Sequence, residues 1–455
     1  NWYSSLDGWL YHPGTRLTGP STLILYYTCN HTSSSMEPLT CVVDNGSYEV
    51  RVGFCGDVVP RLIAPNCTAR PRQQLRVLVA DEIYNIRNLA QLEVTRPLER
   101  GILVNAACQR DVWKRCFDIV RCEPRDSKVT VTESVLSPPS VQRAMDEVLF
   151  EDFGFLGRCR VPAPVCVAEA AAQLDQDVFH MQNDGLNDVW KQQRCLNEIN
   201  LVVDFGHTAT TVTPVVAGST IPCAIRRNDI GGQVLTGHLR ELISYRQYNM
   251  ANEGVTLDQL KRRLCFVSQD WKQDIVACEG TTRERGVAGP HYAEYILPDF
   301  QTLDHGYARL TRCPMSVFDE VRRRTPMDAM PQFLRLESER FCAPELLFSP
   351  QNIGLSQCGV HELIADAILH VDSCLRTPLS QRIIICGGGS QLPGLCNRVE
   401  RELFSLLPQR VCVMRPSDAD HLAFRGAAIL AAIPDNYLSK TEWEEYGPDC
   451  LYVRP

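Results

Sequence analysis

The chain has 455 residues, of which 44% are hydrophobic and 22% are charged, and its formal net charge at pH 7 is -8. A chain of this length exceeds what one hydrophobic core supports, so we expect two large lobes. The acidic balance excludes general affinity for nucleic acid, which needs a basic face that displaces counterions.

The 21 cysteines are odd in number and scattered, and the chain has no Cys-x-x-Cys pair. This pattern excludes a disulfide framework or a zinc knuckle and predicts an intracellular protein with buried thiols. No apolar run approaches the roughly 20 residues that span a bilayer, so no membrane association is expected. The basic runs at residues 261–263 and 322–324 are interpreted as solvated helix faces.

Residues 1–39 are predicted to form a flexible N-terminal extension, since they are rich in Ser, Thr, Gly, Pro and aromatic residues without a period. The first lobe is assigned to residues 40–198 plus 424–455, with a small outer subdomain at about 66–94. Its predicted elements, in chain order, are strands at Cys41–Asp44, Val50–Phe54 and Val129–Thr132, and a helix that starts at Ser140.

A polar stretch at residues 175–197 is expected to form a surface loop or helical insert between the lobes. The second lobe is assigned to residues 199–423. Helices are predicted at residues 232–246 and 257–270, and a strand begins at about residue 382. Its outer subdomain covers about 227–335 and contains an irregular insertion at 302–331 that is suited to partner contacts.

Two strands end in the same way, each stopping at an acid and a glycine: residues 42–47 and residues 201–206. Such turns are lined with backbone N–H groups that suit phosphate, although an ordinary hairpin is the alternative for either one. A third glycine turn at residues 383–390 precedes a helical pattern of Leu395, Val399, Leu403 and Leu406. Together they predict turns that face each other across a cleft for a nucleotide and its divalent metal.

The motifs resemble actin from residue 40 to residue 455. The segments that carry the resemblance are residues 42–57, 101–105, 132–133, 201–214, 224–236, 264–267, 339–345, 387–394 and 426–430. Within that family, residues 238–247 and 295–300 are similar to the nuclear actin-related proteins. The resemblance implies an α/β, two-lobed actin-like fold in which two ribonuclease-H-like domains flank a nucleotide cleft.

The resemblance also implies which residues bind a nucleotide. Asp44 and Asp204 match the two acids that hold Mg²⁺ through water, and Arg51 stands in place of a phosphate-binding lysine. The full set of nucleotide-binding positions is Asp44, Gly46, Ser47, Arg51, Asp204, Gly206, His207, Gly232, Lys261, Gly387 and Gly388.

Several positions depart from the family pattern. Tyr48 replaces a glycine, and a side chain at the positive φ expected there would cost roughly 1 to 2 kcal/mol. His207 replaces an acid, Arg262 replaces a glutamate, and Asp420 falls where a lysine is expected near the base. The sequence therefore leaves open whether ATP or ADP binds with Mg²⁺.

Hydrolysis is expected to be weak or absent. By alignment, Glu169 and Thr211 stand where actin has the glutamine and histidine that position the attacking water. An ionised glutamate donates no hydrogen bond, and threonine is no base near neutral pH. Loss of such groups typically costs on the order of a hundred- to ten-thousand-fold in rate. We therefore predict a pseudo-ATPase with no catalytic residue.

The resemblance implies a nuclear protein, with cytoplasmic residence as the alternative, that is a fixed subunit of a Swr-type remodelling complex exchanging a histone variant. The implied partners are the motor subunit and a small zinc-finger-bearing subunit, with the nucleosome contacted indirectly. Residues 66–100 are too short for actin's docking loop, so no homopolymer is expected. The alternative function is an ATP-binding protein of the same fold with weak ATPase activity in the cytoskeleton; a sugar kinase or a heat-shock-type chaperone is disfavoured.

Overall fold

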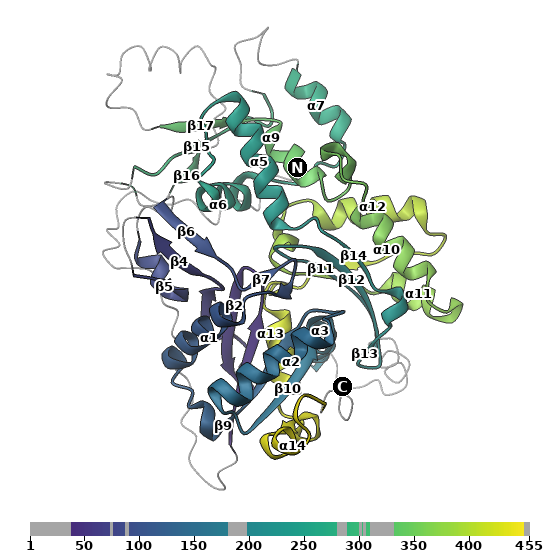
Figure 1. The fold of residues 1–455 in the computed structure, drawn as a ribbon. Helices are drawn as coiled ribbons and strands as arrows, with labels where there is room; N and C mark the ends of the chain where they lie inside the picture. Colours follow the sequence, from purple (N-terminus) through teal and green to yellow (C-terminus); the bar gives the residue numbers. More distant parts are fainter. Residues whose placement is uncertain are drawn as a thin grey trace.

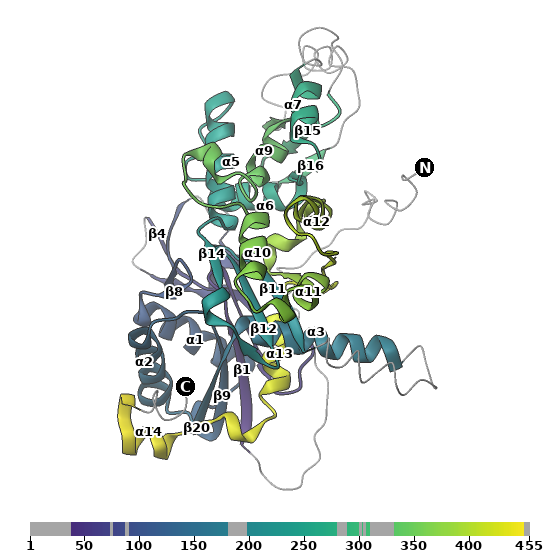
Figure 2. The same cartoon turned by 90° about the vertical axis from the view of Figure 1, so that its right-hand side faces the viewer.

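The computed structural model describes residues 38–72, 76–86, 91–180, 198–279, 289–299, 303, 306–309 and 332–449. Within these ranges the chain folds into two lobes, each built on its own central sheet (Figure 1). The helices α7 and α14 lie at opposite ends of the molecule in both views (Figures 1 and 2). The predicted N-terminal extension lies almost wholly outside the described residues, as do residues 181–197 and the basic run at 322–324.

The first central sheet has the strand order β20-β10-β9-β1-β2-β3. β1 runs antiparallel to β2, with Val43 opposite Val52, and parallel to β9, with Val43 opposite Val131. The strand bounds are Leu39–Asn45 (β1), Glu49–Phe54 (β2), Leu62–Pro65 (β3), Ser127–Glu133 (β9), Gly157–Pro162 (β10) and Leu438–Ser439 (β20). The strands predicted at 41–44, 50–54 and 129–132 are therefore present.

Helices cover one face of this sheet around a core that includes the fully buried Val43, Trp113 and Phe155. The helix α1 begins after Asn105, whose side chain accepts a hydrogen bond from the Cys108 N–H and so satisfies a free helical donor. The helices of this lobe are α1 (Ala106–Val120), α2 (Pro139–Glu147), α3 (Ala163–His180), α13 (Leu422–Leu430) and α14 (Lys440–Tyr446).

A small sheet of order β5-β4-β6 lies beside the first lobe, next to the two-stranded hairpin β7–β8. Its strands pair antiparallel, with Ala69 of β4 opposite Leu78 on one side and Val94 on the other. The bounds are Thr68–Pro71 (β4), Leu78–Val79 (β5), Leu92–Thr95 (β6), Leu98–Glu99 (β7) and Ile102–Leu103 (β8).

The second central sheet has the order β13-β12-β11-β18-β19, and β14 pairs with β12. β11 and β18 run parallel, with Val203 opposite Ile385, so their carboxyl ends meet at one edge of the sheet. This places the acid of the second turn beside the third glycine turn. The bounds are Ile199–Phe205 (β11), Thr210–Val216 (β12), Ser219–Thr220 (β13), Arg226–Asn228 (β14), Ile383–Cys386 (β18) and Val413–Met414 (β19).

Around this sheet lie several helices and a second small sheet of order β16-β15-β17. The helix bounds are Gly232–Arg246 (α5), Gly254–Leu264 (α6), Trp271–Glu279 (α7), Glu339–Glu345 (α9), Val360–Leu369 (α10), Ser373–Gln381 (α11) and Leu395–Leu406 (α12). The strands of the small sheet are Ala293–Ile296 (β15), Tyr307–Arg309 (β16) and Phe333–Leu336 (β17).

Two predictions for this lobe are wrong in part. The helix expected at 257–270 ends at Leu264, because the next residues pair elsewhere: the Phe266 N–H donates to the Arg340 carbonyl and the Val267 N–H to the Pro393 carbonyl. The insertion at 302–331, expected to be irregular, contains β16, whose pairing with β15 gives it regular backbone hydrogen bonds. The rest of that insertion falls largely outside the described residues.

The helices α3 and α13 lie between the two sheets and belong to both cores. Alternating residues of β1 and β11 face opposite sides, so Val42 and Val202 point toward these helices. From α13, Phe424 packs with Val42 and Leu422 packs with Val202. A Cβ at Gly426 would lie 1.8 Å from the Cys166 carbonyl oxygen of α3, so only glycine allows this close approach.

Candidate functional site

A cavity of about 320 Å³ lies between the two lobes. Residues from three turns line it: the turn after β1, the turn after β11 and the turn after β18. All eleven positions selected from the sequence contribute to this lining: Asp44, Gly46, Ser47, Arg51, Asp204, Gly206, His207, Gly232, Lys261, Gly387 and Gly388. The turns after β1, β11 and β18 and the helices α5 and α6 bring these residues together although they are far apart in the chain.

A buried amide network fixes the turn between β1 and β2. The side chain of Asn66 is fully buried and donates to the Gly46 carbonyl oxygen at 2.9 Å and to Asn45 Oδ1 at 3.0 Å. Gln109, also fully buried, donates to Asn66 Oδ1 at 3.2 Å. A Cβ at Gly46 would lie 2.7 Å from the Glu49 carbonyl oxygen, so the turn requires glycine there. Its shape is therefore set before any ligand binds.

The third turn approaches the second so closely that it needs glycine. Gly387 has a φ of +83°, and a Cβ there would lie 2.3 Å from Asp204 Oδ1. A Cβ at Gly388 would meet no other atom within 4 Å, so the backbone of this residue faces the open cavity. Glycines at these two positions leave backbone groups accessible in the manner of an anion-binding turn.

Two acids, one from each lobe, line the cavity and interact electrostatically. Burial raises the pKa of Asp204 to about 6, the neighbouring Asp44 adds to this rise, and Arg51 opposes it. Asp44 accepts a hydrogen bond from the Thr132 hydroxyl at 2.7 Å and contacts Arg51 Nη1 at 3.3 Å. A divalent cation would relieve the repulsion between the two carboxylates, so these residues fit Mg²⁺, which needs few protein ligands because it retains water. No group of three or more His, Cys, Asp or Glu side chains suited to a metal occurs in the described part of the chain.

A second group of residues that line the cavity makes contacts around Tyr48. Its hydroxyl donates to Asp258 Oδ2 at 3.1 Å, and its ring centroid lies 4.8 Å from that of His207. The guanidinium carbons of Arg96 and Arg262 lie 4.8 and 5.0 Å from the same ring centroid. Tyr48 and Arg96 belong to the first lobe and the other three residues to the second, so this group of five, the Tyr48 cluster, joins the lobes.

Charges in the Tyr48 cluster are strongly perturbed. Burial lowers the pKa of His207 to about 3, and the positive charge of Arg96 acts in the same direction, so the ring is neutral. Burial opposes ionisation of Asp258, but Lys261 and Arg262 outweigh it and lower its pKa. The Lys261 ammonium donates to Gly232 O at 2.9 Å, to Thr236 Oγ1 at 2.8 Å and to Asp258 Oδ1 at 2.7 Å. Its three donors are thus all used within the protein.

The structure corrects three sequence interpretations. Tyr48 is not among the non-glycine residues with positive φ, so the expected strain is wrong, because the turn does not require a left-handed conformation there. Glu169 is exposed on α3 and does not line the cavity, whereas Val167 does. Residues two apart on a helix point to nearly opposite sides, which separates Glu169 from the site. Lys261, interpreted from the sequence as part of a solvated helix face, is buried.

Thr211 does line the cavity, as the alignment places it, and Asp420 and Arg262 do as well. Sequence reasoning missed Arg96 and Asp258. The available signal was the placement of Asp258 three and four residues before Lys261 and Arg262, which is the spacing of ion pairs on one helix face. Arg96 offered no such pattern, because its partners are the carbonyl oxygens of Ser47 and Tyr48.

Comparison with known proteins agrees with this geometry. The family model described as Actin matches residues 36–454. The chain is 33% identical over 434 residues to actin-related protein 6 of rice (Oryza sativa subsp. indica), covering 89% of this chain and 96% of the rice protein. It is 33% identical over 426 residues to actin-related protein 6 of Neurospora crassa (90% and 92% covered). It is 31% identical over 415 residues to that of Drosophila melanogaster (89% and 97% covered).

The actin fold generally binds a nucleotide with Mg²⁺. Within the described ranges, none of the helices combines the length and apolar character needed to cross a bilayer. The 17 cysteines described are all free thiols.

Proposed function

This chain belongs to the actin family, and we propose that it is a non-catalytic structural subunit of a nuclear complex of the Swr type that remodels chromatin and exchanges a histone variant. Support comes from the similarity to actin-related protein 6 of plants, fungi and animals over about nine-tenths of the chain. The observation that carries the non-catalytic part of the proposal is the Tyr48 cluster, in which side chains of the two lobes contact each other across the cleft.

The alignment with actin supports the absence of water-positioning groups, because Glu169 and Thr211 stand at the two positions concerned. Thr211 faces the cavity but its hydroxyl is no base near neutral pH, and Glu169 points into solvent. From α3, the residues that face the cavity are Ala163, Pro164 and Val167, which cannot transfer a proton. We therefore expect little or no hydrolysis of ATP.

Magnesium would be held by Asp44 and Asp204, and when bound it would neutralise phosphate charge. The glycine turns would present backbone donors to the phosphates, and Arg51 would add a positive charge beside Asp44. Any nucleotide that binds the folded form stabilises it through mass action. Its role in this proposal is structural.

The proposed partners are the motor subunit and a small zinc-finger-bearing subunit, with indirect contact to the nucleosome because the chain carries a net charge of -8. We propose nuclear residence and no homopolymer. The connections between the strands of the small sheet β5-β4-β6 are short and leave little length for a loop that docks into a neighbouring copy, which supports the absence of a homopolymer.

A second candidate is a weak cytoskeletal ATPase, favoured by the paired acids Asp44 and Asp204 and by the intact glycine turns. Phosphate release from the purified full-length chain with Mg-ATP separates the two candidates. The structural proposal predicts no release above the buffer rate, no pelleted polymer, and remodelling subunits that co-purify with the native protein from nuclear extract. Steady hydrolysis or pelleting with Mg-ATP would reject it.

A further inference from the structure

We propose that Tyr48 is a built-in occupant of the part of the cleft lined by His207, Asp258 and Arg262, and that it holds the two lobes together in place of the sugar and base of a bound nucleotide. In the closed form this part then excludes a nucleotide, while the acids Asp44 and Asp204 keep their affinity for a divalent cation. The inference rests on the proposed non-catalytic function and adds to it the group that replaces the ligand.

The contacts of Tyr48 match what a nucleoside would supply. A purine offers an aromatic face and a ribose offers hydroxyl donors; Tyr48 offers both in one side chain. The guanidinium carbons of Arg96 and Arg262 lie 4.8 and 5.0 Å from its ring centroid, and the His207 ring lies beside it. Its hydroxyl donates to the Asp258 carboxylate at 3.1 Å. Such cation–π contacts and charged hydrogen bonds are the stronger kinds of polar interaction in a partly desolvated site.

Two second-lobe groups in this part of the cleft, Asp258 and Lys261, already use their hydrogen-bonding capacity within the protein. Asp258 accepts from Tyr48, from Arg262 Nε at 2.9 Å and from Lys261 Nζ at 2.7 Å. Lys261 donates its other two hydrogen bonds to the Gly232 carbonyl oxygen and the Thr236 hydroxyl. A nucleoside could bind here only if Tyr48 left and these ion pairs rearranged.

Hydrogen bonds within the first lobe fix the backbone of the turn that carries Tyr48. Arg96 Nη1 donates to the Ser47 carbonyl oxygen at 3.1 Å and to the Tyr48 carbonyl oxygen at 3.0 Å, and Asn66 donates to Gly46. These bonds fix the backbone of the turn, so Tyr48 moves with its lobe. Separation of the lobes therefore breaks the bond to Asp258, and closure restores it.

The test is a comparison of nucleotide affinity between the full-length wild type and Tyr48→Ala, measured by calorimetric titration with Mg-ADP and with Mg²⁺ alone. Tyr48→Ala should bind Mg-ADP at least ten-fold more tightly than the wild type, while Mg²⁺ alone binds both equally. The matched control is Tyr245→Ala, which removes a tyrosine that is 93% exposed and should leave both affinities at the wild-type value.

Equal Mg-ADP affinity in wild type and Tyr48→Ala, or no binding by either, would overturn the inference. If Tyr48→Ala does not fold, Tyr48→Ser repeats the comparison with a residue suited to a turn. Failure here is distinct from failure of the proposed function, which would be seen as ATP hydrolysis by the wild type or as the absence of remodelling subunits among co-purifying proteins.

Discussion

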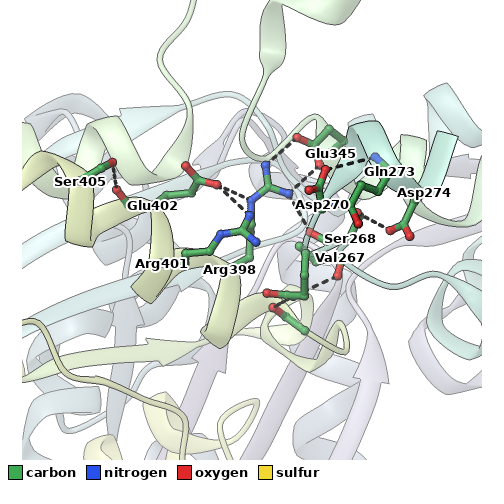
Figure 3. A network of polar contacts seen from close by, with 12 residues as sticks. Val267, Ser268, Asp270, Gln273, Asp274, Glu345, Arg398, Arg401, Glu402 and Ser405 are labelled. Carbon is green, nitrogen blue, oxygen red and sulfur yellow. Dashed lines mark hydrogen bonds and ion pairs between the residues drawn. The ribbon is translucent and has the colours of Figure 1, made fainter. Parts of the chain in front are cut away.

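Two arginine–carboxylate networks in this protein use the same chemistry for different ends. In the second lobe, Arg398 of α12 donates to Glu402 Oε1 at 2.6 Å, to Glu345 Oε1 at 3.1 Å and to the Ser268 carbonyl oxygen at 2.7 Å (Figure 3). All of these partners belong to one lobe. In the Tyr48 cluster, by contrast, Asp258 and Arg262 meet Tyr48 and Arg96 of the other lobe.

Each of the two networks also contains a cation–π contact. The guanidinium of Arg398 lies 4.9 Å from the Phe348 ring centroid, much as Arg262 lies 5.0 Å from that of Tyr48. Phe348 is buried in its own lobe, whereas Tyr48 reaches across the cleft. A network within one lobe stabilises that lobe whatever the cleft does, and a network between lobes stabilises only their closed arrangement.

The largest expected effect is at Arg398. Burial raises the pKa of Glu345 and Arg398 opposes this, so Arg398→Met would leave a buried carboxylate without its cation. We expect the free energy of unfolding in urea to fall by about 3 to 5 kcal/mol. Arg401→Met, which removes a half-exposed arginine of the same helix, should cost less than about 0.5 kcal/mol. Equal losses in the two variants would contradict the comparison.

Removing the charge of Asp204 should stabilise the protein, whereas removing that of Arg398 should destabilise it. The folded-state pKa of Asp204, about 6, lies above its unfolded value, so its charge destabilises the protein above pH 6 and the penalty disappears as the pH falls toward 4. Asp204→Asn should therefore raise the unfolding free energy by about 2 kcal/mol at pH 8 and leave it unchanged at pH 4. Mg²⁺ should raise the melting temperature of the wild type more than that of the variant. A variant less stable than wild type at pH 8 would show that this charge is not costly.

His207 gives the next effect. Its folded-state pKa of about 3 lies below the usual 6.5, so the stability it contributes is present above pH 6.5 and is lost as the pH falls. Between pH 7 and pH 5 we expect a loss of about 1 to 2 kcal/mol that His207→Gln abolishes. Both proteins in this comparison should carry Asp204→Asn, because protonation of Asp204 changes the stability in the opposite direction over the same pH range. An identical pH profile with and without His207 would exclude a buried neutral ring.

The smallest effect concerns the Tyr48 hydroxyl. Tyr48→Phe keeps the ring and its cation contacts, and Asp258 keeps Lys261 and Arg262, so about 1 kcal/mol of closure should be lost. This loss should be seen as faster proteolysis of the turns that line the cleft, while the melting temperature of the second lobe stays unchanged. Tyr245→Phe serves as the control, since that side chain is 93% exposed. A wild-type cleavage rate in Tyr48→Phe would mean that the hydroxyl does not hold the lobes.

The sequence predicted the parts of the site that depend on local pattern. Asp44 and Asp204 each follow an apolar strand, and the parallel pairing of β11 with β18 brings Asp204 beside Gly387. The sequence could not predict the contacts that form only when elements distant in the chain pack together. The bond between Tyr48 and Asp258 joins residues 210 positions apart and exists only once the lobes are placed. Glu169 was misplaced because an alignment fixes a residue's order in the chain and not the side of α3 on which it lies.

The position of α3 and α13 between the sheets has a consequence for substitutions in either helix. Gly426 allows these helices into close backbone contact, and both helices pack into the core of each lobe. A larger residue at position 426 would therefore disturb the packing of both lobes and not of one alone.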